Sequence, residues 1–236
     1  IGPDSDYAYF RLEPGRYWVY SGTWQQLHQD PVPVVITNHI AQSPFFADGT
    51  YLVITNNGTV DDGLYGYHRE RDGYSQVFNI LSQINPSWNP VAVPARITMP
   101  FLTTPFVEGR YSTVTRTQTV TNYPLLLSSI PAVVLIRYTT ENTVHKNNLT
   151  MEINGTEYEK CVKITHTLRV TTSSLGRNDP YEDGDVIQTT EDAYTFHLAP
   201  GIGMISIVHI KRTLGQDNIY TETRFAGDLL STGSLY

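Results

Sequence analysis

Residues 154–204 contain two long alternating segments, one on each side of a polar loop, and a Pro-Gly break at the end. In residues 158–170 the even positions are mostly apolar and the odd positions mostly polar, which is the period of a strand with one face on a core. Asn154-Gly155, directly before, is the residue pair of a tight hairpin turn. The second segment, 186–198, runs into Ala199-Pro200-Gly201-Ile202-Gly203, where the proline has no N–H to donate to a ladder. This part of the chain therefore predicts antiparallel sheet.

The rest of the chain repeats the pattern, with apolar or alternating runs separated by Gly, Pro, Asn and Asp. We expect strands at residues 7–12, 16–20, 34–37, 50–55, 64–69, 74–78, 111–121, 132–138, 204–210 and 220–225. Helix is expected only at residues 78–84 and in a short tail at 228–230. The predicted fold class is mainly β: a large antiparallel curved sheet, either a half-barrel (β-clam) or a sandwich, with one or two short helices.

In residues 111–121, threonine occupies every second position from Thr113 to Thr121. Both faces of this expected strand are polar or mixed, so neither face reads as one that packs on a core. The pattern predicts either a strand at the edge of the sheet or a strand that faces a water-filled groove.

The chain has 236 residues, enough to bury a sizeable core. We expect one all-β domain over residues 1–236, with the option of two similar halves that meet in the Pro-rich segment 86–105. An internal echo keeps the second option open, because Glu13-Pro14-Gly15-Arg16-Tyr17 and Val107-Glu108-Gly109-Arg110-Tyr111 share a Gly-Arg-Tyr sequence before a predicted strand. A match of this length also arises by chance.

Composition excludes one class of partner. The net charge is −7 and the isoelectric point is near 5.4, whereas a nucleic-acid binder needs a basic surface to neutralise phosphates. Cys161 is the only cysteine, so an intrachain disulfide is impossible. Apolar runs all fall short of the roughly 20 residues that a membrane-spanning helix needs.

Four short motifs carry a resemblance to a class of known proteins. The spacing Tyr9-Phe10-x-Leu12-x-Pro14-Gly15-x-x-Trp18-x-Tyr20 resembles the opening of many exported bacterial proteins and lipoproteins of uncharacterised function. Those proteins also have a middle Pro…Gly…aromatic segment, similar to residues 105–111, and a Gly-Thr-x-x-x-x-Cys-x-x-Ile element, similar to residues 155–164. Their closing Ala-Pro-Gly-Ile-Gly is similar to residues 199–203. Arg11 stands where they usually have proline, Tyr111 stands where they have tryptophan, and the sequence shows no lipidated N-terminal cysteine.

The resemblance implies a periplasmic half-barrel (β-clam) of the kind found among lipid-handling lipoproteins. It implies an exported protein in the periplasm or outer cell envelope of a bacterium. Membrane contact would come only through a lipid anchor at an N-terminus outside this sequence. The expected function is non-catalytic: the curved sheet binds a lipid, another apolar small molecule or an envelope component. The alternative is a structural or interaction module that binds protein or glycan through sheet edges and loops.

The search for chemistry gives few candidates. The sequence has no nucleophile elbow, phosphate-binding loop, zinc-protease motif or cysteine pair, so we expect neither an enzyme nor a cofactor. His166, His197 and His209 lie on three predicted strands and would bind a metal only if those strands brought the rings together. Isolated strand histidines are the favoured interpretation.

The densest group of carboxylates lies in residues 179–185. Oxygen ligands on a Gly-containing loop suit a hard cation, which makes Asp179, Asp183 and Asp185 weak metal candidates. Hairpin loops also favour Asp and Gly for conformational reasons alone, and a structural turn is the favoured interpretation.

Aromatic residues crowd the N-terminal half and give the one positive indication of a ligand site. They fit a concave apolar pocket or, as the favoured interpretation, an ordinary core. The weak candidates for ligand contact are Trp18, Trp24, Tyr65 and Tyr67.

Overall fold

Twelve strands form one antiparallel sheet in the order β6-β5-β4-β3-β2-β1-β12-β11-β10-β9-β8-β7. The computed structural model describes residues 9–10, 12–41, 49–56, 63–71, 73–78, 97–123, 132–175 and 183–235. The strands are β1 (Arg16–Gln26), β2 (Val32–Ile40), β3 (Thr50–Asn56), β4 (Gly63–Glu70), β5 (Gly73–Phe78), β6 (Ile97–Thr103), β7 (Tyr111–Tyr123), β8 (Ala132–Ile153), β9 (Thr156–Leu175), β10 (Asp183–Ala199), β11 (Gly203–Leu214) and β12 (Tyr220–Ser234).

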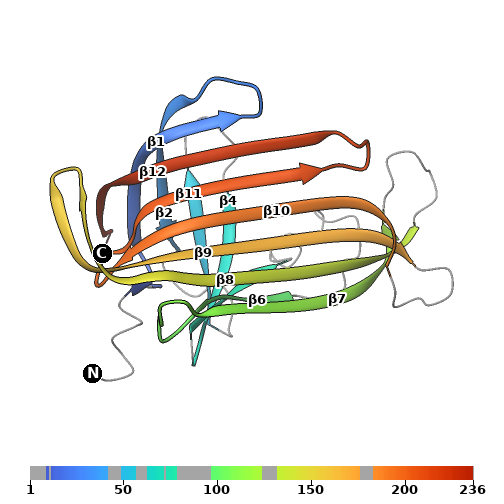
Figure 1. The fold of residues 1–236 in the computed structure, drawn as a ribbon, viewed down its shortest axis with the longest axis horizontal. Coiled ribbons are helices and arrows are strands. Elements are labelled where there is room, and N and C mark those ends of the chain that lie inside the picture. Colours follow the sequence, from blue (N-terminus) through green and yellow to red (C-terminus); the bar gives the residue numbers. More distant parts are fainter. Residues whose placement is uncertain are drawn as a thin grey trace.

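The sheet consists of two meanders, β1–β6 and β7–β12, joined by the pairing of β1 with β12. In Figure 1 the long strands of the second meander lie side by side, and β2 and β4 run at a steep angle to them. The sheet curls until β6 packs on the second meander, where Ile97 and Met99 join a cluster with Val120 of β7 and Val134 of β8. The result is a nearly closed, barrel-shaped sheet, which confirms the predicted curved antiparallel fold.

Two local predictions were wrong. Residues 228–230 belong to β12 rather than to a helical tail, because this part of the chain pairs with β1, with Asp228 opposite Ser21 and Leu229 opposite Tyr20. Tyr9, Phe10 and Leu12 lie outside any strand, and the first strand begins at Arg16. Of the expected helix at 78–84, Phe78 ends β5 and the remainder lies outside the described residues. The described ranges contain no α-helix.

β7 is the last strand in the sheet order, so the prediction of an edge strand at residues 111–121 is confirmed. Its threonines at 113, 115, 117 and 119 are exposed. Val120 on the other face is fully buried. The alternation in the sequence therefore marks an edge whose outer face is wet and whose inner face meets the core.

The principal core is rich in aromatic rings from both meanders. Phe101 of β6 lies 5.5 Å from Phe196 of β10 and 4.9 Å from Tyr67 of β4, measured between ring centroids. Phe10, before the first strand, contacts the same group at 5.6 Å from Phe101. Edge-to-face and tilted ring pairs of this kind add packing energy beyond burial itself. The rings fasten the short-stranded meander onto the long-stranded one.

The sequence echo is also an echo in backbone geometry. Gly15 and Gly109 have φ angles of 80° and 79°, in the left-handed region that glycine adopts without strain. Both glycine N–H groups donate to a carbonyl of the next strand, Gly15 to Ile40 at 3.0 Å and Gly109 to Val144 at 2.8 Å. Each meander therefore starts with the same turn.

Candidate functional site

The two most recognisable motifs of the sequence, the aromatic opening and the Ala-Pro-Gly-Ile-Gly close, contact each other. Arg16 Nη2 donates to the carbonyls of Gly201 and Ile202 at 2.7 and 3.0 Å. Trp18 Nε1 also donates to the Ile202 carbonyl, at 2.7 Å. Arg16 lies over the Trp18 ring, with the guanidinium carbon 5.4 Å from the ring centroid, a cation–π arrangement. Arg16 and Trp18, alternate residues of β1, thus hydrogen-bond to the turn between β10 and β11, although β12 lies between β1 and β11 in the sheet.

Gly203, the last glycine of this turn, could not be replaced by a larger residue without strain. Its φ angle is +101°, and a Cβ there would lie 3.0 Å from Trp18 Nε1. The residue after Gly203 makes a similar contact, because the Tyr20 hydroxyl donates to the Met204 carbonyl at 3.1 Å. Burial raises the pKa of this phenol far above its usual range. We call Arg16, Trp18 and Tyr20 with residues 199–204 the seam lock. Arg16 Nη2, Trp18 Nε1 and the Tyr20 hydroxyl all donate within the protein, so the role of the seam lock is structural.

The four aromatic ligand candidates lie in different surroundings. Trp18 is 1% exposed in the seam lock and Tyr67 is 8% exposed in the ring cluster around Phe101. Trp24 is partly buried against the same core. The side chain of Tyr65 lies outside the described residues. Among the residues that can be placed, the aromatic set fills the interior itself.

A polar and aromatic row crosses the interior face of four strands. Asn142 of β8 is opposite His166 of β9, which is opposite Tyr194 of β10, which is opposite His209 of β11. Asn142 Oδ1 and His166 Nδ1 lie 2.8 Å apart. The rings of Tyr194 and His209 stack at 4.1 Å, and His209 Nε2 lies 2.9 Å from Asp192 Oδ1. The row connects the deep interior with the partly exposed contact between His209 and Asp192.

His166 is fully buried, and its Nε2 has no hydrogen-bond partner in the described part of the chain. Burial lowers the pKa of His166 to about 4, against a smaller upward influence from Asp192, because a charged ring cannot be solvated there. The imidazole is therefore neutral near pH 7. Phe101 packs edge-on against it at 4.8 Å, so the ring is both a buried polar group and a packing surface between the meanders.

Where the structure places the candidate metal ligands, it does not bring them together. β9, β10 and β11 are neighbours, but His197 pairs with Lys163 and Ser206, on the opposite face from His166 and His209. Within the described ranges no group of three or more His, Cys, Asp or Glu residues is arranged to hold a metal. Of the loop carboxylates, Asp185 is exposed. Asp179 and the side chain of Asp183 lie outside the described residues.

A small cleft lies between β6, β7 and β8. It measures about 10 Å³, which is room for a single water molecule. Its wall includes the side chains of Thr103, Arg110, Ser112 and Asn142. Arg110 Nη1 already donates to the carbonyls of Thr104 and Pro105, at 3.3 and 3.2 Å. The cleft is far too small for a lipid.

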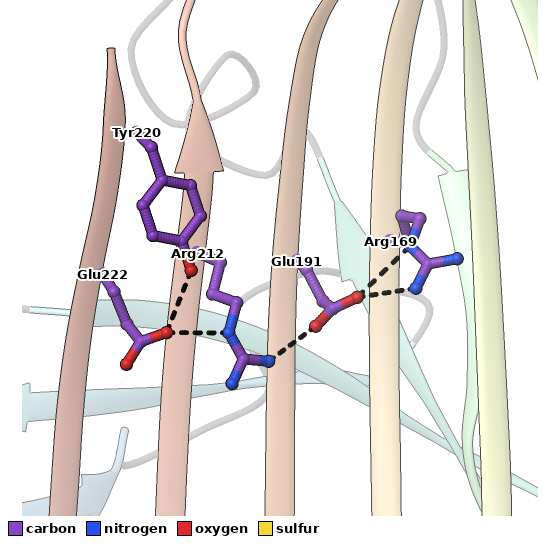
Figure 2. Close-up of polar contacts among 5 residues, drawn as sticks. All are labelled: Arg169, Glu191, Arg212, Tyr220 and Glu222. Carbon is purple, nitrogen blue, oxygen red and sulfur yellow. Dashed lines mark hydrogen bonds and ion pairs between the residues drawn. The ribbon is translucent and has the colours of Figure 1, made fainter.

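On the outer face of the long strands, charged residues form a ladder (Figure 2). Glu191 of β10 accepts hydrogen bonds from Arg169 of β9 at 2.7 Å and from Arg212 of β11 at 2.9 Å. Arg212 also donates to Glu222 of β12 at 2.8 Å. Hydrogen bonds from Arg169 and then Arg212 lower the pKa of Glu191. The two arginines and two glutamates neutralise one another, so the ladder has no net charge.

An ordered turn with exposed apolar side chains lies beside this ladder. The Tyr220 hydroxyl donates to Glu222 at 3.0 Å, which fixes the ring next to Arg212. The exposed fractions are 39% for Leu214, 59% for Ile219 and 46% for Tyr220. Gly215 N–H donates to the Ile219 carbonyl at 3.0 Å, and Ile219 N–H donates to the Asp217 carboxylate at 3.0 Å. We call Leu214, Ile219 and Tyr220 the turn patch.

Sequence reasoning missed both the seam lock and the ladder. Each depends on which residues face each other across strands that are far apart in the chain. The available signal for the ladder was a charge at an outward position of each of four strands, but only the register shows that these positions form one row.

Comparison with known proteins adds little to this description. No family model matches the chain, and no characterised protein matches its sequence. One solved structure, described as a "putative lipoprotein" from Parabacteroides distasonis ATCC 8503, aligns with 93% of this chain and 97% of its own. The identity is 11% and the TM-score is 0.34. A likeness of this degree carries no inference about function. No helix within the described ranges has the length and apolar character of a membrane span.

Proposed function

We propose that the chain is a non-catalytic protein of the bacterial cell envelope, periplasmic or at the outer surface, and that it binds a partner protein through its outer face. The proposed binding surface rests on one observation, the exposed turn patch beside the neutral ladder. An ordered turn that presents two aliphatic side chains and a tyrosine has the composition of a protein contact.

The surroundings of the patch support a protein rather than a sugar as the partner. The Tyr220 hydroxyl and the Arg212 Nε group already donate to the Glu222 carboxylate, which leaves fewer of these donors and acceptors to bind sugar hydroxyls. The ladder holds the Tyr220 ring in one place, and a side chain fixed before binding loses less entropy when a partner arrives. What the patch offers is apolar area in a fixed shape.

An apolar ligand in the interior is the second candidate, and the ring cluster around Phe101 favours it. The interior aromatic side chains that can be placed are almost completely buried by their own neighbours, with Phe101 and Phe196 each 2% exposed. A lipid would have to displace these contacts. Binding at the outer face needs no such rearrangement, which is why we prefer a protein partner there to a ligand in the interior.

Site-specific photocrosslinking in the cells that produce the protein tests the proposal. A photoreactive phenylalanine analogue replaces Tyr220, and a matched variant carries it at Tyr111, which is 57% exposed at the start of β7. We expect a discrete protein adduct from position 220 that is absent from position 111 and is lost when Ile219→Asp is added. Fractionation of the same cells should place the chain in the envelope.

Adducts of equal strength at both positions, or none at position 220, would contradict the proposed surface. A stoichiometric lipid in organic extracts of the purified protein, found by mass spectrometry, would favour the second candidate instead. Recovery of the chain from the cytosol would overturn the envelope assignment.

A further inference from the structure

The β8–β9 hairpin changes character towards its tip. From Val134 opposite Ser174 to Val144 opposite Ile164 the register is unbroken. Beyond that point it shifts three times before the turn, between Val144/Lys146, Lys146/Leu149 and Leu149/Met151. Bulges of this kind insert unpaired residues, interrupt the ladder and bend the ribbon. In Figure 1 the tip of this hairpin, in yellow, turns away from the other long strands.

Two non-glycine residues at the bend adopt left-handed backbone conformations. Asn148 has a φ angle of 57° and Lys160 one of 55°. Asparagine tolerates this region, but lysine is strained there. They lie on opposite strands of the hairpin, so the bend has a left-handed residue on each side, and the one at Lys160 is strained. This is where the ribbon has the fewest ladder bonds to lose.

The bent end, residues 147–160, covers one end of the core, and we call it the cap. Its underside is apolar: Ile153 is 6% exposed, and Leu149, Met151 and Tyr158 are partly buried against the core. Its outer residues are polar and exposed, among them Asn148, Thr150, Glu152, Glu157 and Glu159.

Side-chain hydrogen bonds at three separate points hold the cap to other parts of the described structure. Asn154 Nδ2 donates to the Leu229 carbonyl of β12 at 2.9 Å. Asn147 Nδ2 donates to the Phe106 carbonyl at 3.2 Å, and the Tyr9 hydroxyl donates to the Lys160 carbonyl at 2.7 Å. A segment with a small apolar underside, an exposed outer face and an interrupted ladder belongs to the low end of local stability.

We propose that the cap is a gate: residues 147–160 open as a unit at the bulges while the rest of the sheet stays folded, and opening uncovers the apolar end of the core. The cap meets β12 at Leu229, whereas the turn patch is at the other end of that strand. The gate is therefore separate from the proposed partner surface and goes beyond it.

Cys161 is a built-in reporter of the gate. It is the only cysteine and is 0% exposed, directly after the bulge. Its thiol donates to the Tyr158 carbonyl at 3.3 Å, and burial raises its pKa. The reagent 5,5′-dithiobis(2-nitrobenzoic acid) can reach it only when the cap lifts or the whole protein unfolds.

The experiment measures labelling of Cys161 in the intact chain against urea concentration, with global unfolding followed by circular dichroism. The rate for the fully unfolded chain serves as the reference for intrinsic reactivity. We expect an opening constant at least about tenfold larger than the global unfolding constant, with a much weaker dependence on urea, since local opening exposes less surface than unfolding.

Asn154→Gly removes the bond to Leu229 and keeps a residue that suits the positive φ angle of 52° at this turn. It should raise the native-state labelling rate about fivefold and the global unfolding constant by about the same factor, because the bond is broken in both the open and the unfolded states, while labelling at low urea keeps its weak dependence on urea. Thr150→Ala is the matched control on the exposed face of the same hairpin and should change neither. Labelling that follows global unfolding at every urea concentration would show a static cap and overturn the proposal. Labelling of Asn154→Gly at low urea that stays at the wild-type rate would also overturn it, because opening of the cap has to break this bond.

Discussion

The two meanders begin with the same turn and then diverge. Two residues after the arginine of each turn, β1 carries Trp18 and β7 carries Ser112. Trp18 is 1% exposed in the seam lock, whereas β7 ends the sheet. The turn decides where a strand starts. The side chains that follow decide whether that strand becomes the central seam or an edge.

The meanders also differ in the length of their strands. β6 has 7 residues, while β8 has 22. The longer strands form the wall with the ladder and the polar row. The shorter strands bring aromatic rings such as Tyr67 and Phe101 against that wall. The comparison suggests one meander that supplies the surface and one that closes it.

The largest expected effect tests the seam. Trp18→Ala should lower the free energy of unfolding by about 3–5 kcal/mol, because it removes a buried indole and leaves the Ile202 carbonyl without that donor. The corresponding change in the other meander, Ser112→Ala, should stay within about 0.5 kcal/mol. Urea unfolding of both variants measures the difference. Similar losses for the two would mean that β1 and β7 are equally important to stability.

The second prediction concerns the contact between the meanders at His166 and Phe101. The folded-state pKa of His166, about 4, is below its unfolded value. Folding therefore favours the neutral ring, and its contribution is complete above about pH 6.5 and is lost as pH falls from there to about 4. The loss between pH 7.5 and 4.5 should be about 2–3 kcal/mol.

The comparison of wild type with His166→Gln isolates this contribution, since both chains contain the same carboxylates. Urea unfolding at the two pH values should show a shallower pH dependence for the variant. An identical pH dependence in both proteins would mean that folding does not shift the pKa of His166.

The smallest effect tests how far the two turns are equivalent. Gly109 has a φ angle of +79° and nothing within 4 Å of the position a Cβ would take, so Gly109→Ala should cost only backbone strain, about 1–2 kcal/mol. Gly109→Asn should cost less, because asparagine tolerates this conformation. Gly15 is buried, and Gly15→Ala should cost at least as much as Gly109→Ala in the same denaturation assay. A Gly15→Ala variant with unchanged stability would contradict the equivalence of the two turns.

Local pattern was enough to predict most of the sheet. The alternation in residues 158–170 and 186–198 corresponds to β9 and β10, and the threonine pattern identified β7 as an edge. Local pattern failed at residues 228–230. The short apolar pair there suggests a helix when it is considered alone, but it forms part of a strand because this segment pairs with β1. The neighbour that decided the outcome is far away in the sequence.

The candidate sites were harder to predict for the same reason. Trp18 looked like a ligand contact because sequence shows a ring but not the carbonyl 184 positions away that its N–H meets. The ladder around Glu191 and the row through His166 require the register of four strands. One-residue slips would send these side chains to the opposite faces.

The pairing of β1 with β12 has a consequence for how the protein is made. It is the one contact in the strand order that joins elements distant in the sequence, with Arg16 opposite Ser234. Each meander can grow hairpin by hairpin as the chain emerges, but the seam has to wait for nearly the last strand. Until then β1 and the growing second meander both expose strand edges, the surfaces most prone to pair with the wrong chain. The slow and vulnerable step in assembly is thus the pairing of β1 with β12 in the middle of the sheet, because these two strands are synthesised furthest apart in time.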